Sequence, residues 1–221
     1  IEGLGCPKEK LEVVPVGVDT SFFQPNYGLN KKKGLIKLIT VGRLDKVKGH
    51  QYCIEVVREL LKLAVNVELT IIGEGAEHFH LESLINKYSL NKVINLVGSK
   101  NSIEIREALW KHDIYLLLAV PVENDRRETQ GLATLEAQAC GLPAIVFNSG
   151  GVKYTVNNKI SGFVCQEFNI DEVAEKVKYL SENAQSLSEM GRNAIEFVNK
   201  KYSQNSINEK WKQLYNVNKK A

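Results

Sequence analysis

The sequence of 221 residues has few of the features that mark membrane-spanning, disulfide-rich or disordered proteins. Its longest apolar run, residues 114–122, is far shorter than the ~18 residues that a membrane-spanning helix needs. Its four cysteines are scattered and form no C-x-x-C pair, which favours free, mostly buried thiols in a reducing cytoplasm over disulfides or a zinc site. Lys and Arg number 29 against 26 Asp and Glu, so the chain is neither strongly basic nor strongly acidic. A hydrophobic share of 43% indicates an ordinary globular protein of one large domain or a tight pair.

Short apolar runs alternate with stretches of helical periodicity over most of the chain. Five runs are predicted to be buried strands: 35–41, 67–72, 93–97, 114–118 and 144–148. The stretches between them place apolar residues on one helical face, as with Cys53, Val57, Leu60, Leu61 and Ala64. This pattern predicts an α/β fold with a doubly wound, Rossmann-like parallel sheet. Its ligand is expected beyond the carboxyl ends of the strands.

The last quarter of the chain changes character. Asn169 and Glu172 have the spacing of a capping box that opens a helix. Residues 186–217 are helical in pattern and rich in lysine, with a break near Tyr202 and Ser203. We therefore expect a lead-in segment (1–34), a Rossmann-like domain (35–182) and C-terminal helices (183–221). The lysine run at 31–33 is read as a solvated loop.

The common phosphate-binding loops are not present. The turn after the first predicted strand fits neither G-x-G-x-x-G nor G-x-x-x-x-G-K-[ST]. Gly73 and Gly75 form a G-x-G after the second strand, but His78 occupies the position of the third glycine. The first turn does carry Arg43 and Lys48, a guanidinium fork and a mobile point charge for phosphate oxygens. Alone, such a pair would be an ordinary solvated feature.

A pair of glutamates, Glu128 and Glu136, stands out by its context rather than its spacing. Glu74 and Glu82 have the same spacing, as do Glu167 and Glu175. Glu128, however, ends a polar loop after a buried strand, and Gly131 then opens a short helix with Glu136 in its second turn. The amino end of that helix would attract an anion, and the Glu136 carboxylate could accept hydrogen bonds from a ribose diol. The alternative is that Glu136 only caps the helix or forms a salt bridge.

Together these segments resemble the nucleotide-sugar half of a retaining glycosyltransferase of family 4, which has the GT-B fold of two Rossmann-like domains. The likeness covers nearly the whole chain, and its motifs occur in the family's order. They are Val14-Pro15-Val16-Gly17-Val18-Asp19 with Phe22 and Phe23; Val41-Gly42-Arg43-Leu44 through Lys48-Gly49; Ile71-Ile72-Gly73-Glu74-Gly75; segment 128–136 running into Ala139-Cys140-Gly141-Leu142-Pro143; and Ser149-Gly150-Gly151 with Ser161-Gly162-Phe163.

The resemblance implies a role for each matching residue. Arg43 and Lys48 would hold the donor diphosphate, Glu136 the ribose hydroxyls, and Glu128 hydroxyls of the donor sugar. The backbone amides near Gly131, Leu132 and Ala133 would face phosphate or sugar, and the base would lie near Gly73, Gly75 and the loop that ends at Lys100.

Two segments depart from the family pattern. Val152-Lys153-Tyr154 replaces the common Pro-Glu after the double glycine. The segment Glu128-Thr129-Gln130-Gly131, which we call the carboxylate loop, replaces the family's Glu-Gly-hydrophobic-Gly form. Both departures concern the contacts to the sugar rather than those to phosphate.

The implied activity is retaining transfer of a hexose from a UDP- or GDP-sugar to a glycan or lipid-linked acceptor in polysaccharide biosynthesis. The resemblance implies no metal or other cofactor, and the sequence has no Asp-x-Asp. Because the chain starts at Ile1 and holds one sheet, we expect a missing N-terminal acceptor domain and an inactive isolated fragment. Trp211 and Leu214, on the last helix, should then lack full burial.

Other interpretations stay open at this point. A GT-B nucleotide-sugar epimerase or phosphorylase would share the fold, and a nucleotide-binding module would bind without catalysis. His50 and His112 are read as surface or capping residues, while His78 and His80 diverge on one helix. We expect no nucleic-acid partner and a cytoplasmic location, with peripheral contact at the inner face of the membrane in the full-length enzyme.

Overall fold

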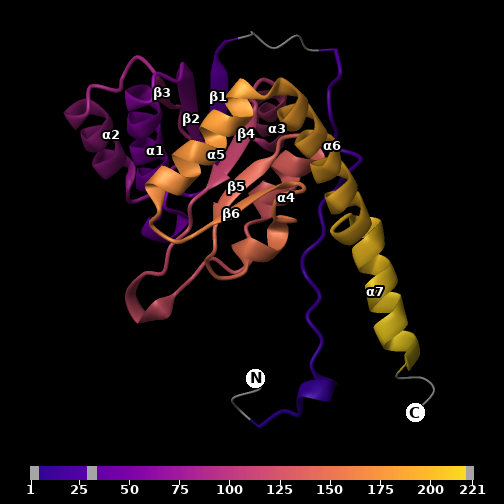
Figure 1. Ribbon diagram of the computed structural model, residues 1–221. Helices are drawn as coiled ribbons and strands as arrows, with labels where there is room; N and C mark the ends of the chain where they lie inside the picture. Colours follow the sequence, from indigo (N-terminus) through magenta and orange to yellow (C-terminus); the bar gives the residue numbers. More distant parts are fainter. Residues whose placement is uncertain (1–4, 29–33, 218–221) are drawn as a thin grey trace.

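The computed structural model describes residues 5–28 and 34–217, which build one six-stranded parallel sheet (Figure 1). The lysine run at 31–33 and Ile1 lie outside the described residues. The strands are β1 (Ile36–Val41), β2 (Val67–Ile72), β3 (Ile94–Leu96), β4 (Ile114–Leu117), β5 (Ala144–Phe147) and β6 (Gly162–Cys165). Their order is β3-β2-β1-β4-β5-β6, and every pairing is parallel. The order reverses between β1 and β4, which places the expected ligand crevice beyond the ends of these two strands.

The prediction of a doubly wound α/β fold is confirmed. Five strands lie within one or two residues of their predicted ends, and β6 is the strand that the apolar pattern did not predict. The helices are α1 (His50–Lys62), α2 (His78–Lys87), α3 (Ser102–Trp110), α4 (Leu132–Ala139), α5 (Ile170–Glu182), α6 (Ala184–Lys201) and α7 (Gln204–Val217).

Helices cover both faces of the sheet. Helices α1, α2 and α5 pack on one face, while α3, α4 and the end of α6 pack on the other (Figure 1). Leu38 and Ile39 are neighbours on β1 and point to opposite faces, yet both are fully buried. This is why the strands read as continuous apolar runs rather than as alternating ones.

The predicted apolar face of α1 is correct only in part. Cys53, Val57 and Leu60 are buried, but Leu61 is 39% exposed. Ala64 lies beyond the end of the helix, where the chain turns toward β2 with φ 57°. The sequence pattern therefore predicted helix for two residues beyond Lys62, where the helix ends.

Half of the predicted capping box on α5 forms. The Asn169 side chain accepts from the Glu172 N–H at 3.1 Å, as expected. The Glu172 carboxylate, however, accepts from the Gln166 N–H at 2.9 Å rather than from the amide of the capping residue. The carboxylate thus ties the helix to the loop that follows β6.

The cysteines occur as free thiols, as predicted. Cys53, Cys140 and Cys165 are buried, and burial raises the pKa of each thiol to about 12. Among the described residues, no helix is both long and apolar enough to cross a membrane.

The predicted break in the C-terminal helices is confirmed, and the lead-in segment is tied to it. The Val18 N–H donates to the Tyr202 carbonyl (2.8 Å), and the Gln204 N–H donates to the Val18 carbonyl (2.9 Å). Beyond this junction α7 extends away from the sheet (Figure 1). Trp211 is 45% exposed and Leu214 is only half-buried, so neither is fully buried within this domain, as expected.

Candidate functional site

The turn after β1 carries the two predicted cations. Asp45 caps the short 3-10 turn Lys46–Lys48 by accepting from the Val47 N–H at 3.2 Å. The Arg43 side chain is 70% exposed, and its Nη2 lies 3.7 Å from Asp45 Oδ2. The Lys48 side chain is 21% exposed and is directed elsewhere, toward the loop after β4. Both cations therefore lie at the carboxyl end of β1, as the sequence predicts.

Lys48 joins this turn to the carboxylate loop. Its Nζ lies 2.7 Å from Glu128 Oε2, while Glu128 Oε1 accepts from the Gly131 N–H at 3.1 Å. Burial alone would raise the pKa of Glu128. The hydrogen bond and charge of Lys48, with the backbone N–H groups of Gly131 and Gln130, outweigh it and hold that pKa below its usual range. Three predicted site residues thus meet where the strand order reverses.

Helix α4 begins immediately after Gly131. Gly131 has φ 75°, a left-handed conformation that favours glycine, and a Cβ there would lie 2.8 Å from Leu117 Cδ2 and require that side chain to shift. The N–H groups of Leu132 and Ala133 belong to the first turn, where a helix has no acceptor for them. The Thr134 hydroxyl behind them is buried and has no hydrogen-bond partner among the described residues. The amino end of α4 therefore offers several donors to an anion.

Glu136 lies in the second turn of α4, as predicted. Its carboxylate is partly buried, and burial raises its pKa above the usual range. Within 5–28 and 34–217 no residue forms an ion pair or hydrogen bond with it. The alternative of a capping or salt-bridging glutamate is thus not what the structure contains.

The loops after β2 and β3 lie beside the turn that carries Arg43. The Gly73 N–H donates to the Gly98 carbonyl at 2.9 Å, and the Leu44 N–H donates to the Glu74 carbonyl at 2.8 Å. Gly75 follows in the same loop and accepts from the His78 N–H at 3.1 Å.

Lys100 does not join this group. Its Nζ pairs with Glu104 Oε1 at 2.9 Å, within the first turn of α3. Lys100 is the last loop residue before the capping residue Asn101, so its backbone belongs to the loop while its ammonium group pairs with α3.

His50 is not the surface residue that the sequence suggested. It is 2% exposed, beneath the turn that carries Arg43. A carbonyl can only accept, so Nε2–H donates to the Arg43 carbonyl (3.3 Å) and the Thr40 hydroxyl donates to Nδ1 (3.4 Å). Burial and the charge of Lys48 lower the pKa of His50 to about 4, so the ring is neutral at pH 7.

His112 occupies a capping position, as expected. His112 bonds the Ala108 carbonyl near the end of α3 through Nδ1 at 2.6 Å, which is a capping contact. His78 and His80 both lie on α2, and His80 Nε2 lies 3.2 Å from Gln51 Oε1.

Sequence reasoning missed the side chain of Gln130. Its Oε1 accepts from the Val16 N–H at 2.9 Å, and its Nε2 donates to the Val16 carbonyl at 2.8 Å. The side-chain amide thereby ties the carboxylate loop to the lead-in segment, much as a strand neighbour would. The position was noted only as a departure from the family pattern, and no local pattern indicates this partner.

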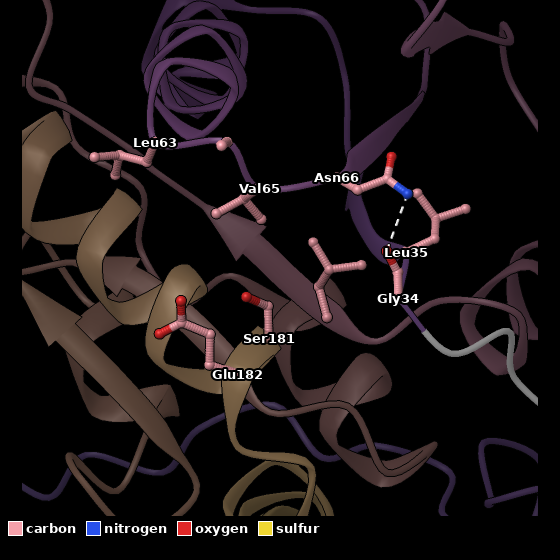
Figure 2. A pocket seen from close by; sticks show the side chains of 9 residues that line it. Gly34, Leu35, Leu63, Val65, Asn66, Ser181 and Glu182 are labelled. Atoms are coloured by element: carbon pink, nitrogen blue, oxygen red, sulfur yellow. Dashed lines mark hydrogen bonds between the residues drawn. The ribbon is translucent and has the colours of Figure 1, made fainter.

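Two cavities lie at opposite ends of the sheet, and neither is lined by Arg43, Lys48, Glu128 or Glu136. One of about 640 Å³ lies next to the Arg43 turn and includes Asp45, Lys46 and Arg126 in its lining. Another, of about 250 Å³, lies at the amino ends of β1 and β2, where Asn66 Nδ2 donates to the Gly34 carbonyl at 2.9 Å (Figure 2). It is at the opposite end from the predicted residues. The part of the chain that the structure describes holds no group of three His, Cys, Asp or Glu side chains placed to bind a metal.

Two curated proteins that are similar to this chain in sequence are named as glycosyltransferases. WcaL of Escherichia coli (strain K12), named as a colanic acid biosynthesis glycosyltransferase, is 29% identical over 94% of this chain and 51% of its own. The amylovoran biosynthesis glycosyltransferase AmsK of Erwinia amylovora is 30% identical over 81% of this chain and 44% of its own. The chain thus spans about half the length of these relatives.

Solved structures share the fold. HepE of Anabaena, crystallised with UDP, superposes with a TM-score of 0.83 at 18% identity, over 98% of this chain and 60% of its own. The C-terminal domain of LpcC from Francisella tularensis superposes with a TM-score of 0.70 at 24% identity, over 85% of this chain and all of its own.

The family model described as glycosyl transferases group 1 matches residues 25–197, the segment that contains the sheet and both glutamates. The chain therefore belongs to the glycosyl transferases group 1, and its Rossmann-like sheet is that of a GT-B glycosyltransferase domain.

Proposed function

We propose that the chain is the donor-binding half of a retaining hexosyltransferase that uses a UDP- or GDP-sugar. The observation that carries the proposal is the meeting of Lys48, Glu128 and Gly131 at the reversal of strand order, beside the amino end of α4. A diphosphate placed there would face two cations and the free amides of a helix end. The ordered motifs of the family support the retaining stereochemistry.

Each residue has one role in the proposed transfer. Arg43 and Lys48 neutralise the charge that develops on the departing nucleoside diphosphate, and the amides of Leu132 and Ala133 add to this effect. Glu136 accepts from the ribose hydroxyls, for which its lack of a protein partner leaves it available. The base lies near Gly73, Gly75 and the loop up to Lys100.

Glu128 is proposed to receive the donor sugar. One of its oxygens already accepts from Lys48 and the other from Gly131 N–H. A carboxylate oxygen has two lone-pair directions, so each can still accept from a sugar hydroxyl. No metal or other cofactor takes part in this proposal.

The acceptor is proposed to be a glycan or a lipid-linked glycan in polysaccharide biosynthesis. The names of WcaL and AmsK, which refer to colanic acid and amylovoran biosynthesis, support this choice. Because the chain spans about half of these relatives, we propose that the other half supplies the acceptor domain. The 221 residues alone would then bind donor without transferring its sugar.

Isothermal calorimetry with UDP and GDP tests the donor site. Arg43→Ala and Lys48→Ala should each lower affinity by roughly 1.5–3 kcal/mol, which is about tenfold to a hundredfold. Lys92→Ala is the matched control, since Lys92 is exposed in the turn before β3, at the opposite end of the sheet, and should leave affinity unchanged. Unchanged binding in both test variants would refute the assignment.

A further inference from the structure

A groove of about 610 Å³ opens beside the carboxylate loop, where Thr129 and Gln130 line it. We call it the lysine groove. Four segments line it: the lead-in segment, the loop after β4, the loop after β5, and the junction of α6 and α7. Its lining residues are Val13, Val14, Pro15, Thr129, Gln130, Gly151, Tyr154, Thr155, Lys200, Lys201, Tyr202 and Lys210.

Hydrogen bonds join the four segments that line the groove. The Gln130 amide fixes Val16 of the lead-in segment through two bonds. The Tyr202 hydroxyl donates to the Tyr154 carbonyl at 2.6 Å, and the Val18 backbone pairs with residues on either side of the helix break. The groove is therefore preformed rather than a chance gap between loose segments.

The charged part of the lining has one sign. Lys200, Lys201 and Lys210 line the groove together with no Asp or Glu. Within the described ranges, none of the three forms an ion pair. Lys62 and Lys178, elsewhere on the surface, are paired with Glu59 and Glu182. Lys201 Nζ also lies 5.3 Å from the centre of the Phe197 ring, but none of the described carboxylates pairs with any of the three ammonium groups, which favours an anionic occupant.

The rest of the lining is apolar or aromatic. Val13 is 86% exposed and Tyr154 is 66% exposed, with Val14 and Pro15 beside them. Exposed apolar side chains beside a cluster of cations match a ligand that joins an anionic group to an apolar chain.

We propose that the lysine groove binds a phosphate group of the acceptor, carried on an apolar chain. The proposal rests on the proposed glycosyl transfer, and the position of the groove connects the two. Thr129 and Gln130 line the groove and directly follow Glu128, while the Gly151 N–H donates to the Glu128 carbonyl at 2.9 Å. A phosphate held there keeps its attached group beside the proposed position of the donor sugar.

Titration of the 221-residue chain with octyl phosphate, below its micelle concentration, tests the proposal by calorimetry and by amide NMR shifts. Octanol and inorganic phosphate are the two comparison ligands. We expect octyl phosphate to shift the amides of Gln130, Tyr154 and Tyr202, and to bind more tightly than either comparison ligand. The triple variant Lys200→Gln/Lys201→Gln/Lys210→Gln should weaken binding about tenfold.

The matched control is Lys37→Gln/Lys62→Gln/Lys178→Gln, which changes the net charge equally but alters lysines that are ion-paired elsewhere. It should retain octyl phosphate binding, and both triple variants should retain UDP binding. Equal weakening in the two triples, equal affinity for octanol or inorganic phosphate, or displacement of octyl phosphate by UDP would each overturn the groove proposal. If the wild-type chain does not bind UDP, the proposed donor site is wrong, whereas the groove proposal is unaffected.

Discussion

Lys48 and Glu128 come from different loops, after β1 and after β4, and their side chains meet with 2.7 Å between Nζ and Oε2. The contact is half-buried, with 21% and 15% of the two side chains exposed. It therefore both fixes the site and stabilises the fold.

Substitution Glu128→Gln should lower the free energy of unfolding by roughly 1–3 kcal/mol, because Lys48 loses its charged partner in a half-buried position. The pKa of Glu128 is lowered in the folded state, so its contribution is present above about pH 4.5 and is lost as the pH falls through the folded value. Urea unfolding at pH 7 measures the change. Glu175→Gln, at an exposed position on α5, should be neutral; equal loss in both variants would contradict the role of the pair.

Substitution Glu136→Gln should act in the opposite direction and raise stability at pH 7 by roughly 0.5–1 kcal/mol. Burial raises the pKa of Glu136, so its contribution is fully present below the unfolded value and is lost as the pH rises through the folded value. The glutamine side chain has the same shape but does not ionise, so the variant does not lose stability as the pH rises. Thermal unfolding at pH 4 and pH 7 would reveal a gain at the higher pH only; a less stable variant at pH 7 would count against a partnerless carboxylate.

His50 should make stability depend on pH between about 6.5 and 4. Its folded pKa of about 4 lies below its ordinary value, so the unfolded chain binds more protons in this window and stability falls as the pH falls. His50→Gln should flatten the dependence of the unfolding free energy on pH between 7 and 5. His80→Gln, at an exposed position of α2, should keep the wild-type slope. A slope that persists unchanged in His50→Gln would be the contrary result.

Gly151, in the turn after β5, packs closely against the backbone of the carboxylate loop. A Cβ on Gly151 would lie 1.6 Å from the Thr129 carbonyl oxygen, so Gly151→Ala must displace the backbone next to Glu128. We expect a loss of at least about 2 kcal/mol of stability, together with weaker binding of a nucleotide sugar. Gly28→Ala, whose added carbon would lie 3.4 Å from Asn26 Oδ1, an ordinary contact distance, is the control in thermal unfolding. Wild-type stability in Gly151→Ala would show that the loop moves freely.

Local patterns predicted much of the fold and less of the site. The buried strands and the place of Glu136 on α4 follow from apolar runs and from a glycine before a helix, which are signals within a few residues. Strand β6 is as long as β4 and β5, but its middle residues Phe163 and Val164 are only half-buried, so it lacks the long apolar run that marks those strands.

The contacts that give the site its form depend on the folded chain. The pairing of Lys48 with Glu128 and the Gln130 bonds to Val16 join loops far apart in sequence. His50 was misread because its burial depends on the turn folded over it, and no neighbouring residue in the sequence reports that.

The central claim is that the two glutamates contact different parts of one nucleotide sugar. Calorimetry with a nucleoside diphosphate and with its sugar conjugate, UDP and UDP-glucose or GDP and GDP-mannose, measures this on the wild-type chain, Glu136→Gln and Glu128→Gln. Glu136→Gln should weaken both ligands alike, by roughly 1–3 kcal/mol for a lost hydrogen bond to a charged group. Glu128→Gln removes the carboxylate that pairs with Lys48, so it should not weaken the nucleoside diphosphate and should weaken only the nucleotide sugar. Wild-type affinity for both ligands in both variants, or the same losses in Glu175→Gln, would contradict the account.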